Sequence, residues 1–178
     1  FKPYKGFWCY EDGVILKGAQ DLYIATNDEF YWDYIQAYLN EFVDQEGNLK
    51  GYNSSEYNID HVNAGKVLFF AYEKTNDERY KVAIEHQMDQ LRTHPRTNSG
   101  NFWHKNRYPH QVWLDGLYMA LPFFTEYETV FNGKQQYEDI YKQFMEVYKT
   151  HRNKECGLYY HAWDESKSMF WCDEETGL

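Results

Sequence analysis

Two aspartates in apolar and aromatic surroundings are the residues of this sequence best suited to chemistry. Asp60 lies in "YNIDHVNAGK" and Asp115 in "VWLDGLYM", 55 residues further along the chain. An ionised carboxylate removed from water is costly, so such a group is paired, hydrogen-bonded or used. When two carboxylates share one pocket, both cannot ionise cheaply, and the pKa of one rises until it can donate a proton. Together the two aspartates therefore predict acid–base catalysis.

Helix capping is the alternative explanation for both aspartates. Each residue follows a polar loop and precedes an apolar helical pattern. An N-cap aspartate accepts hydrogen bonds from the free backbone N–H groups of the first helical turn. Capping is sufficient for either residue considered alone. Because the two take equivalent places in neighbouring repeats, we expect them to face one cavity, which favours the paired acid–base site.

Histidines and tryptophans surround the second aspartate along the chain. They are His104, His110, His161, Trp103, Trp113 and Trp163. A lone histidine of this kind is usually a hydrogen-bonding partner, and a tryptophan either stacks under a sugar ring or packs in the core. Neither H-E-x-x-H nor a regular His/Asp spacing is present, so we expect no metal. The sequence also lacks G-x-S-x-G, P-loop and G-x-G-x-x-G motifs, so we expect no nucleotide or other cofactor.

A repeat predicts the elements that position these residues. "YIATNDEFYWDYI" at residues 23–35 matches "YEKTNDERYKVAI" at residues 72–84, and a looser copy, "YETVFNGKQQYEDI", begins at Tyr127. Each copy reads as a helix end, a short polar turn and a new helix start. The sequence therefore predicts three helix–turn–helix units.

The two helices of each unit differ in pattern. The second helices are amphipathic, which predicts an outer position; their apolar stripes in the first and third units comprise Tyr31, Tyr34, Ile35, Tyr38, Phe42, Tyr137, Ile140, Tyr141, Phe144 and Tyr148. The first helices are apolar on most sides, which predicts burial on both faces. Pro122 is expected to kink or break the third of them, because proline removes one backbone donor.

Inner helices ringed by outer helices make an α/α toroid. The polar loops before the inner helices then form a funnel, where a small ligand would bind. Beyond the third unit, "GLYYHAWDESKSMFWCD" alternates around a turn at "ESKS". This pattern predicts a short β-hairpin over the funnel mouth.

Bulk composition excludes several classes of protein. The 178 residues carry a net charge of −10 without a Lys/Arg-rich block, so we expect no nucleic-acid partner. No apolar run has membrane-spanning length, and the N-terminus lacks a signal-peptide core. The three widely spaced cysteines read as free thiols, which favours a cytoplasmic location. Aromatic residues make up 20% of the chain, which indicates a packed core more often than sugar-stacking platforms and does not by itself decide between them.

Four sequence blocks resemble glycoside hydrolase family 105, the unsaturated rhamnogalacturonyl hydrolases, and the related family 88 of unsaturated glucuronyl hydrolases. They are "WCYEDGVILKGAQDLY", "YNIDHVNAGKVLFFAYEKT", "THPRTNSGNFWHKNRYPHQVWLDGLYMALPFFTEY" and "GLYYHAWDESKS". The resemblance implies an all-α (α/α)6 barrel. Residues 1–178 would be a single domain carrying about three of its six helical hairpins, the N-terminal half. We therefore expect either self-association or a C-terminal half outside this sequence.

The resemblance also implies roles for individual residues. Asp115 falls on the general acid/base and Asp60 on a second essential aspartate, while His104, Trp113 and His161 fall on the lining of the substrate pocket. We add two substrate-binding candidates from the same segments, which are His110 and Trp163.

The implied reaction is a hydration in pectin degradation. The substrate is an oligosaccharide of rhamnogalacturonan whose terminal galacturonyl residue carries the C4=C5 double bond left by a lyase. The acid protonates C4, water adds at C5, and the hemiketal opens and releases the next sugar. Galacturonyl and glucuronyl substrates both remain open, as do two other classes: a non-catalytic carbohydrate-binding module and a helical-repeat scaffold for protein partners.

Overall fold

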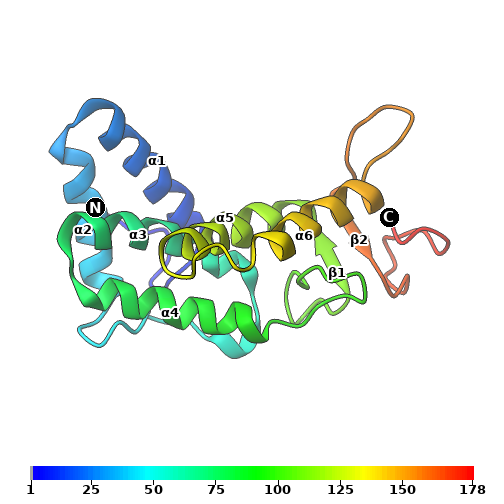
Figure 1. Cartoon of the computed structure of the whole chain (residues 1–178), viewed down its shortest axis with the longest axis horizontal. Coiled ribbons are helices and arrows are strands. Elements are labelled where there is room, and N and C mark those ends of the chain that lie inside the picture. Colours follow the sequence, from blue (N-terminus) through cyan, green and yellow to red (C-terminus); the bar gives the residue numbers. More distant parts are fainter. Residues whose placement is uncertain (1) are drawn as a thin grey trace. The chain divides into compact units, whose positions relative to one another are not determined.

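The computed structural model describes residues 2–178, most of which form helices joined in consecutive pairs (Figure 1). The α-helices are α1 (Tyr10–Thr26), α2 (Glu29–Phe42), α3 (Lys66–Thr75), α4 (Glu78–Thr93), α5 (Leu114–Val130) and α6 (Tyr137–Thr150). Two short 3-10 helices, η1 (Ser54–Glu56) and η2 (Ile59–Gly65), precede α3, and the strands are β1 (Gln111–Trp113) and β2 (Ala162–Asp164). The chain divides into two compact units: residues 2–54 with 60–91, and residues 55–59 with 92–178.

The first unit shows why the sequence repeats. Asn27 and Asn76 end α1 and α3 in the left-handed conformation, each with φ of 55°, which Asn tolerates better than most residues. Asp28 and Asp77 then accept the backbone N–H two residues further on, at 3.0 and 3.1 Å. The same stop and start signals therefore end one helix and begin the next, and the prediction of three helix–turn–helix units is confirmed.

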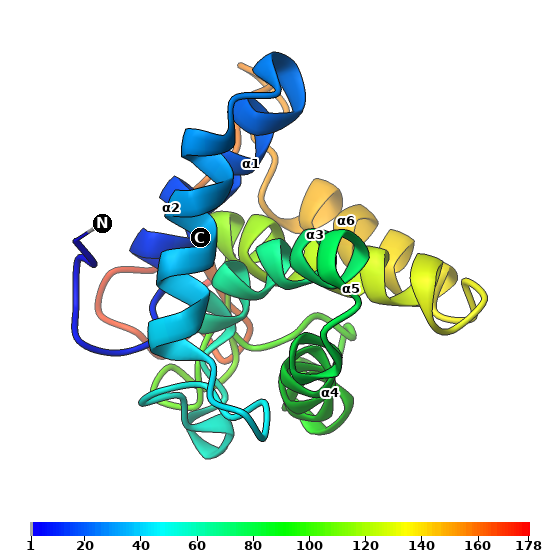
Figure 2. The same cartoon turned by 90° about the vertical axis from the view of Figure 1, so that its left-hand side faces the viewer.

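Inner helices of the first unit are buried to different extents. α3 is apolar and buried nearly all round, with Leu68 and Phe69 at most 4% exposed, as the sequence predicts. α1 packs along α2 and against α3 (Figure 2). Its other side is exposed, including Ile15 and Ile24, so the prediction that α1 is buried on both faces is wrong. An apolar composition shows that a face can be covered, but not that a neighbour covers it.

The second unit contains the third helix pair. α5 runs from Leu114 to Val130 without interruption, so the predicted break at Pro122 does not occur. A proline removes one helical hydrogen bond, and the bonds before and after it keep the helix continuous. After α5 the turn is longer than in the first two pairs. Glu128, which is buried, accepts the side-chain amide of Asn132 and the backbone N–H of Gln136 there.

α6 packs on α5 with a different face from the predicted one. The side chains that it buries are Ile140, Gln143 and Val147. The aromatic residues of the predicted stripe are largely exposed; Tyr141, for example, is 58% exposed. The stripe prediction is therefore wrong for α6 except at Ile140; the tyrosines of the stripe keep their polar ends in water, and Phe144 is exposed with them.

A two-stranded ribbon leads into α5. β1 pairs antiparallel with β2, and the register places Gln111 opposite Asp164 and Trp113 opposite Ala162. The predicted local hairpin around "ESKS" is therefore wrong, because β2 takes its partner from before α5. The segment after β2 folds back instead onto the Asp164 carboxylate, which accepts three backbone N–H groups from residues 166–169.

Two further observations concern the whole described chain. Among residues 2–178, no helix combines the length and the apolar character needed to cross a membrane. The thiols of Cys9, Cys156 and Cys172 are free.

Candidate active site

Asp115 occupies the second position of α5, immediately after β1. The N-cap of α5 is Trp113, which has extended backbone angles and makes no capping hydrogen bond through its side chain. The Oδ1 atom of Asp115 is buried and has no hydrogen-bond partner within residues 2–178. Capping therefore does not explain this aspartate. A carboxylate oxygen that is buried without a hydrogen-bond donor lowers the stability of the fold. A residue retained at such a cost is a candidate for binding or catalysis.

His161 lies beside Asp115. Its Nε2 atom is 3.6 Å from Asp115 Oδ1, and the two side chains are 66% and 39% exposed. The backbone holds this arrangement, because the N–H of Leu114 donates to the carbonyl oxygen of His161 at 2.7 Å. An exposed pair at this distance adds little to stability in water. The pair instead keeps the imidazole of His161 next to the carboxylate of Asp115.

A row of stacked rings borders the start of α5. The rings of His104 and Trp113 stack with centroids 4.3 Å apart and planes 9° apart. Tyr108 stacks on Trp113 at 5.3 Å and 12°. Burial lowers the pKa of His104 to about 3, although the negative charge of Asp115 partly opposes this shift. His104 is therefore a neutral ring at physiological pH.

Close packing explains why a glycine, Gly116, follows Asp115. A Cβ atom at this position would lie 2.8 Å from Ile59 Cδ1 and 3.0 Å from His104 Nδ1, closer than side chains normally approach. The absence of a side chain therefore lets His104 lie against the first turn of α5. The "WLDG" block combines a ring for stacking, a carboxylate and the space that both need.

An apolar cleft of about 380 Å³ opens beside these residues. Its lining comprises Trp113, Tyr160, His161, Ala162, Trp171 and Leu178. Its volume and aromatic walls suit a sugar ring, which binds by stacking on aromatic faces. Tyr160 and Trp171 were not predicted from the sequence; the signal that could have found them is their place in the aromatic runs "LYYHAW" and "MFWC" around His161.

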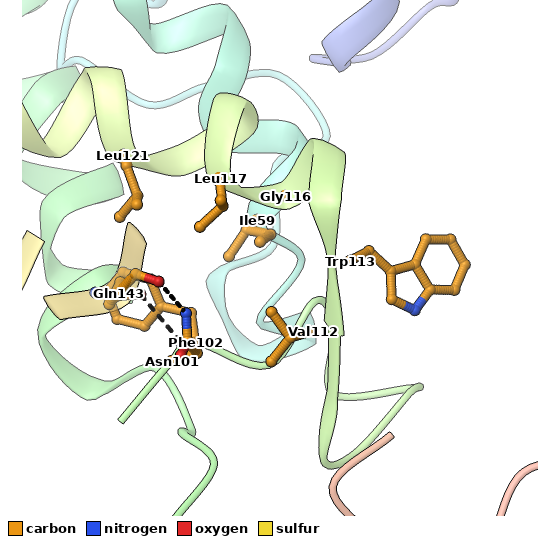
Figure 3. A pocket seen from close by; sticks show the side chains of 9 residues that line it. All are labelled: Ile59, Asn101, Phe102, Val112, Trp113, Gly116, Leu117, Leu121 and Gln143. Carbon is orange, nitrogen blue, oxygen red and sulfur yellow. Dashed lines mark hydrogen bonds between the residues drawn. The ribbon is translucent and has the colours of Figure 1, made fainter. Parts of the chain in front are cut away.

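A second, enclosed cavity near α5 is not a ligand site. Its volume is about 10 Å³, room for about one water molecule and not for a sugar. Figure 3 shows its lining, in which the indole of Trp113 points away from the other labelled side chains. Trp113 therefore turns its ring toward the stack and the cleft.

His110 and Trp163 lie outside the group formed by Asp115, His161, Trp113 and His104. The ring of His110 contacts Trp103, with centroids 4.6 Å apart. Trp163 pairs with Val112 in the ribbon and so lies on the face opposite Trp113, since side chains alternate along a strand. Its indole N–H donates to the carbonyl oxygen of Thr176. Substrate binding by His110 and Trp163 stays a prediction.

Asp60 lies in the first unit, as the second residue of η2. The side chain is 5% exposed. Its segment is fixed by the carbonyl oxygen of His61, which accepts hydrogen bonds from Trp8 Nε1 and Gln87 Nε2, both at 2.9 Å. The N-cap of α3 is Gly65, so Asp60 does not cap that helix. Because Asp60 and Asp115 belong to different units, their convergence on one cavity stays a prediction.

The carboxylate of Asp164 organises the end of the ribbon. It is fully buried and accepts hydrogen bonds from Ser166 N and Oγ, Ser168 N and Met169 N, at 2.7 to 3.0 Å. Burial by itself raises the pKa of Asp164, but these donors outweigh it and hold the pKa below the ordinary value of 3.8.

Asp164→Asn is expected to lower the free energy of unfolding by about 2 to 3 kcal/mol, because an amide NH₂ would face backbone donors. The stabilisation is present above pH 3.8 and is lost as the pH falls through the lowered pKa, so the difference from wild type shrinks in acid. Denaturant unfolding at several pH values measures it. Asp173→Asn is the control, because Asp173 accepts similar bonds but is exposed; equal losses for both would contradict the role of burial.

Paired helices with a carboxylate at the start of an inner helix make this an all-α protein of the (α/α)6-barrel class, of which it carries about three of the six hairpins. The chain belongs to Glycosyl Hydrolase Family 88, whose model matches residues 2–178.

Two solved structures and one relative are similar to this chain. A glycoside hydrolase from family 105 of C. acetobutylicum ATCC 824 superposes with a TM-score of 0.94 at 42% identity, over 97% of this chain and 48% of that one. A possible family 105 member from Klebsiella pneumoniae subsp. pneumoniae MGH 78578 has a TM-score of 0.78 at 22% identity, over 89% of this chain and 41% of that one, a likeness of fold alone.

The unsaturated rhamnogalacturonyl hydrolase YesR of Bacillus subtilis (strain 168) is 28% identical over 163 residues, which are 88% of this chain and 45% of YesR. The chain therefore spans about half the length of the relatives it matches.

Proposed function

We propose that this chain belongs to an unsaturated uronyl hydrolase, which removes the 4,5-unsaturated uronic acid from the non-reducing end of lyase-generated oligosaccharides. The observation that carries the proposal is the buried Oδ1 atom of Asp115, which accepts no hydrogen bond within residues 2–178 and lies beside His161, a residue that lines the aromatic cleft. Membership of family 88 supports the reaction class. The name of YesR supports rhamnogalacturonan, with a galacturonyl terminal residue, as the substrate.

The proposed reaction is a hydration by one carboxyl group acting twice. Asp115 gives its proton to C4 of the vinyl ether, and positive charge develops at C5 and the ring oxygen. Water then adds its oxygen to C5, and its proton returns to the Asp115 carboxylate. The hemiketal opens to a 5-keto sugar, and the freed C1 centre releases the next sugar. Atoms and charge balance without any further reactant.

Neighbouring side chains support this sequence of steps. Trp113 offers an aromatic face at the cleft. His161, 3.6 Å from Asp115, is placed to hydrogen-bond the sugar or the incoming water. Neutral His104 supports the ring of Trp113 without adding a charge that would compete with the developing positive charge. Asp60 is proposed as the second carboxylate, which sets the protonation of Asp115 through its charge.

Carbohydrate binding without catalysis is the alternative for the 178 residues alone. The chain covers 45% and 48% of two relatives, and we propose that the complete barrel needs a second half with three further helix pairs. Turnover by the complete protein together with sugar binding but no turnover by residues 1–178 would support this division. Turnover by residues 1–178 alone would contradict it.

We also propose a cytoplasmic location, on the basis of the three free thiols, and cell fractionation tests it.

Incubation with a lyase-generated unsaturated disaccharide tests the activity. We expect the absorbance of the C4=C5 bond to disappear as 5-keto-4-deoxyuronate is released. In heavy water the product should carry deuterium at C4, because the proton added there comes from an exchangeable acid. Galacturonyl and glucuronyl substrates compared side by side define the specificity. Hydrolysis of a saturated uronoside at a comparable rate, or product without solvent-derived hydrogen at C4, would exclude the hydration mechanism.

A further inference from the structure

A polar cavity of about 570 Å³ lies in the second unit, and the hydration steps do not use it. It is lined by residues of two segments, 55–58 and 105–108. Its volume is within the range of small-molecule sites in proteins.

Backbone hydrogen bonds hold the two walls of this cavity together. The N–H of Ile59 donates to the carbonyl oxygen of His104, and the N–H of Asn106 donates to the carbonyl oxygen of Glu56, both at 3.3 Å. The N–H of Tyr108 donates to the carbonyl oxygen of Lys105 at 2.9 Å and closes a tight turn. The turn projects its two central residues, 106 and 107, and the cavity is therefore formed before any ligand arrives.

The charge of the cavity differs from that of the chain. Lys105 and Arg107 both line it, and Glu56 is the acidic residue of the lining, which leaves an excess of positive charge. The protein as a whole has a net charge of −10. The exposed guanidinium of Arg107 lies over the ring of Tyr108, 5.9 Å from its centroid. Arginine in this setting presents a planar donor fork that matches a carboxylate.

Tyr108 connects this cavity with the candidate active site. It lines the cavity and stacks on Trp113 at 5.3 Å, and Trp113 lines the apolar cleft beside His161. The stacked rings of Tyr108 and Trp113 therefore connect the polar cavity with the apolar cleft. Amide, aromatic and basic side chains together are the groups that recognise an acidic sugar.

We propose that the cavity at Lys105, Arg107 and Tyr108 binds the carboxylate of a second acidic sugar in the substrate. This inference rests on the proposed function and names a substrate class for it. The unsaturated uronyl group is at the non-reducing end, so a second acidic residue can lie only toward the reducing end. The preferred substrates are therefore oligosaccharides with a second uronate, longer than the unsaturated disaccharide.

Equilibrium binding to the protein carrying Asp115→Asn tests this without turnover. The probes are an unsaturated disaccharide with neutral rhamnose as its second sugar, and the tetrasaccharide that adds a galacturonate and another rhamnose. We expect the tetrasaccharide to bind about 10-fold more tightly, the ratio that one charge-assisted hydrogen bond provides. Arg107→Gln should remove most of this ratio without changing disaccharide affinity, and added salt should reduce it.

Lys154→Gln is the matched control, because it removes one exposed positive charge of the same unit outside the cavity. It should leave the ratio unchanged. Retention of the ratio in Arg107→Gln, or equal loss in both variants, would overturn the proposal. Failure of the proposed function would give a different result, because the wild-type protein would then release no uronate, whatever the binding ratio. If release occurs and Arg107→Gln has no effect, the inference alone is wrong.

Discussion

Asp115→Asn is expected to reduce turnover of the unsaturated uronyl substrate by about 10⁴-fold, the top of the range for a general acid–base group. The amide keeps the size of the carboxyl group and its place in α5, but it has no proton to give to C4. It also cannot take the proton from the attacking water. Because one group serves both steps, its loss affects both, and the effect should appear in kcat with little change in substrate affinity.

The fold should be unaffected by this substitution. The Oδ1 atom of Asp115 has no hydrogen-bond partner within residues 2–178, so replacing the carboxylate breaks no hydrogen bond at that atom, and its 3.6 Å contact with the exposed His161 adds little to stability. Thermal unfolding and equilibrium binding of the disaccharide measure this. Glu138→Gln is the control, because Glu138 is an exposed acid in the first turn of α6. Activity of Asp115→Asn within tenfold of wild type would mean that another group is the acid.

Asp60→Asn is expected to be the second most damaging change, with a loss of about 10²-fold or more and a shifted pH–rate profile. A negative charge at residue 60 disfavours ionisation of a neighbouring carboxyl group, so the neutral amide should move the basic limb of the profile, where the proton donor ionises, to lower pH. Rates measured across the pH range show the shift. A loss of activity with an unchanged profile would assign Asp60 a role in binding or folding.

The double variant tests whether the two aspartates share one site. Groups that act as a unit show strongly non-additive losses, whereas independent groups multiply theirs. We therefore expect Asp60→Asn combined with Asp115→Asn to be about as slow as Asp115→Asn alone. Multiplied losses would contradict a shared acid–base site and leave Asp115 acting by itself.

The sequence by itself determined the helix pairs and the place of Asp115. The "TND" repeats end and restart helices through bonds between residues at most five apart in the chain: Asn27 and Asn76 in the left-handed conformation, and Asp28 and Asp77 as caps. Such signals are local, so they can be read without knowing the fold.

Only the tertiary structure decided which side chains meet. β2 pairs with β1 across α5 and α6, and this pairing places His161 beside Asp115 and Trp163 on the other face of the ribbon. Periodicity shows which face of an element is apolar, but the element that covers it is chosen by packing among distant segments. For the same reason the exposed aromatic face of α6 could not be predicted, whereas the burial of α3 could.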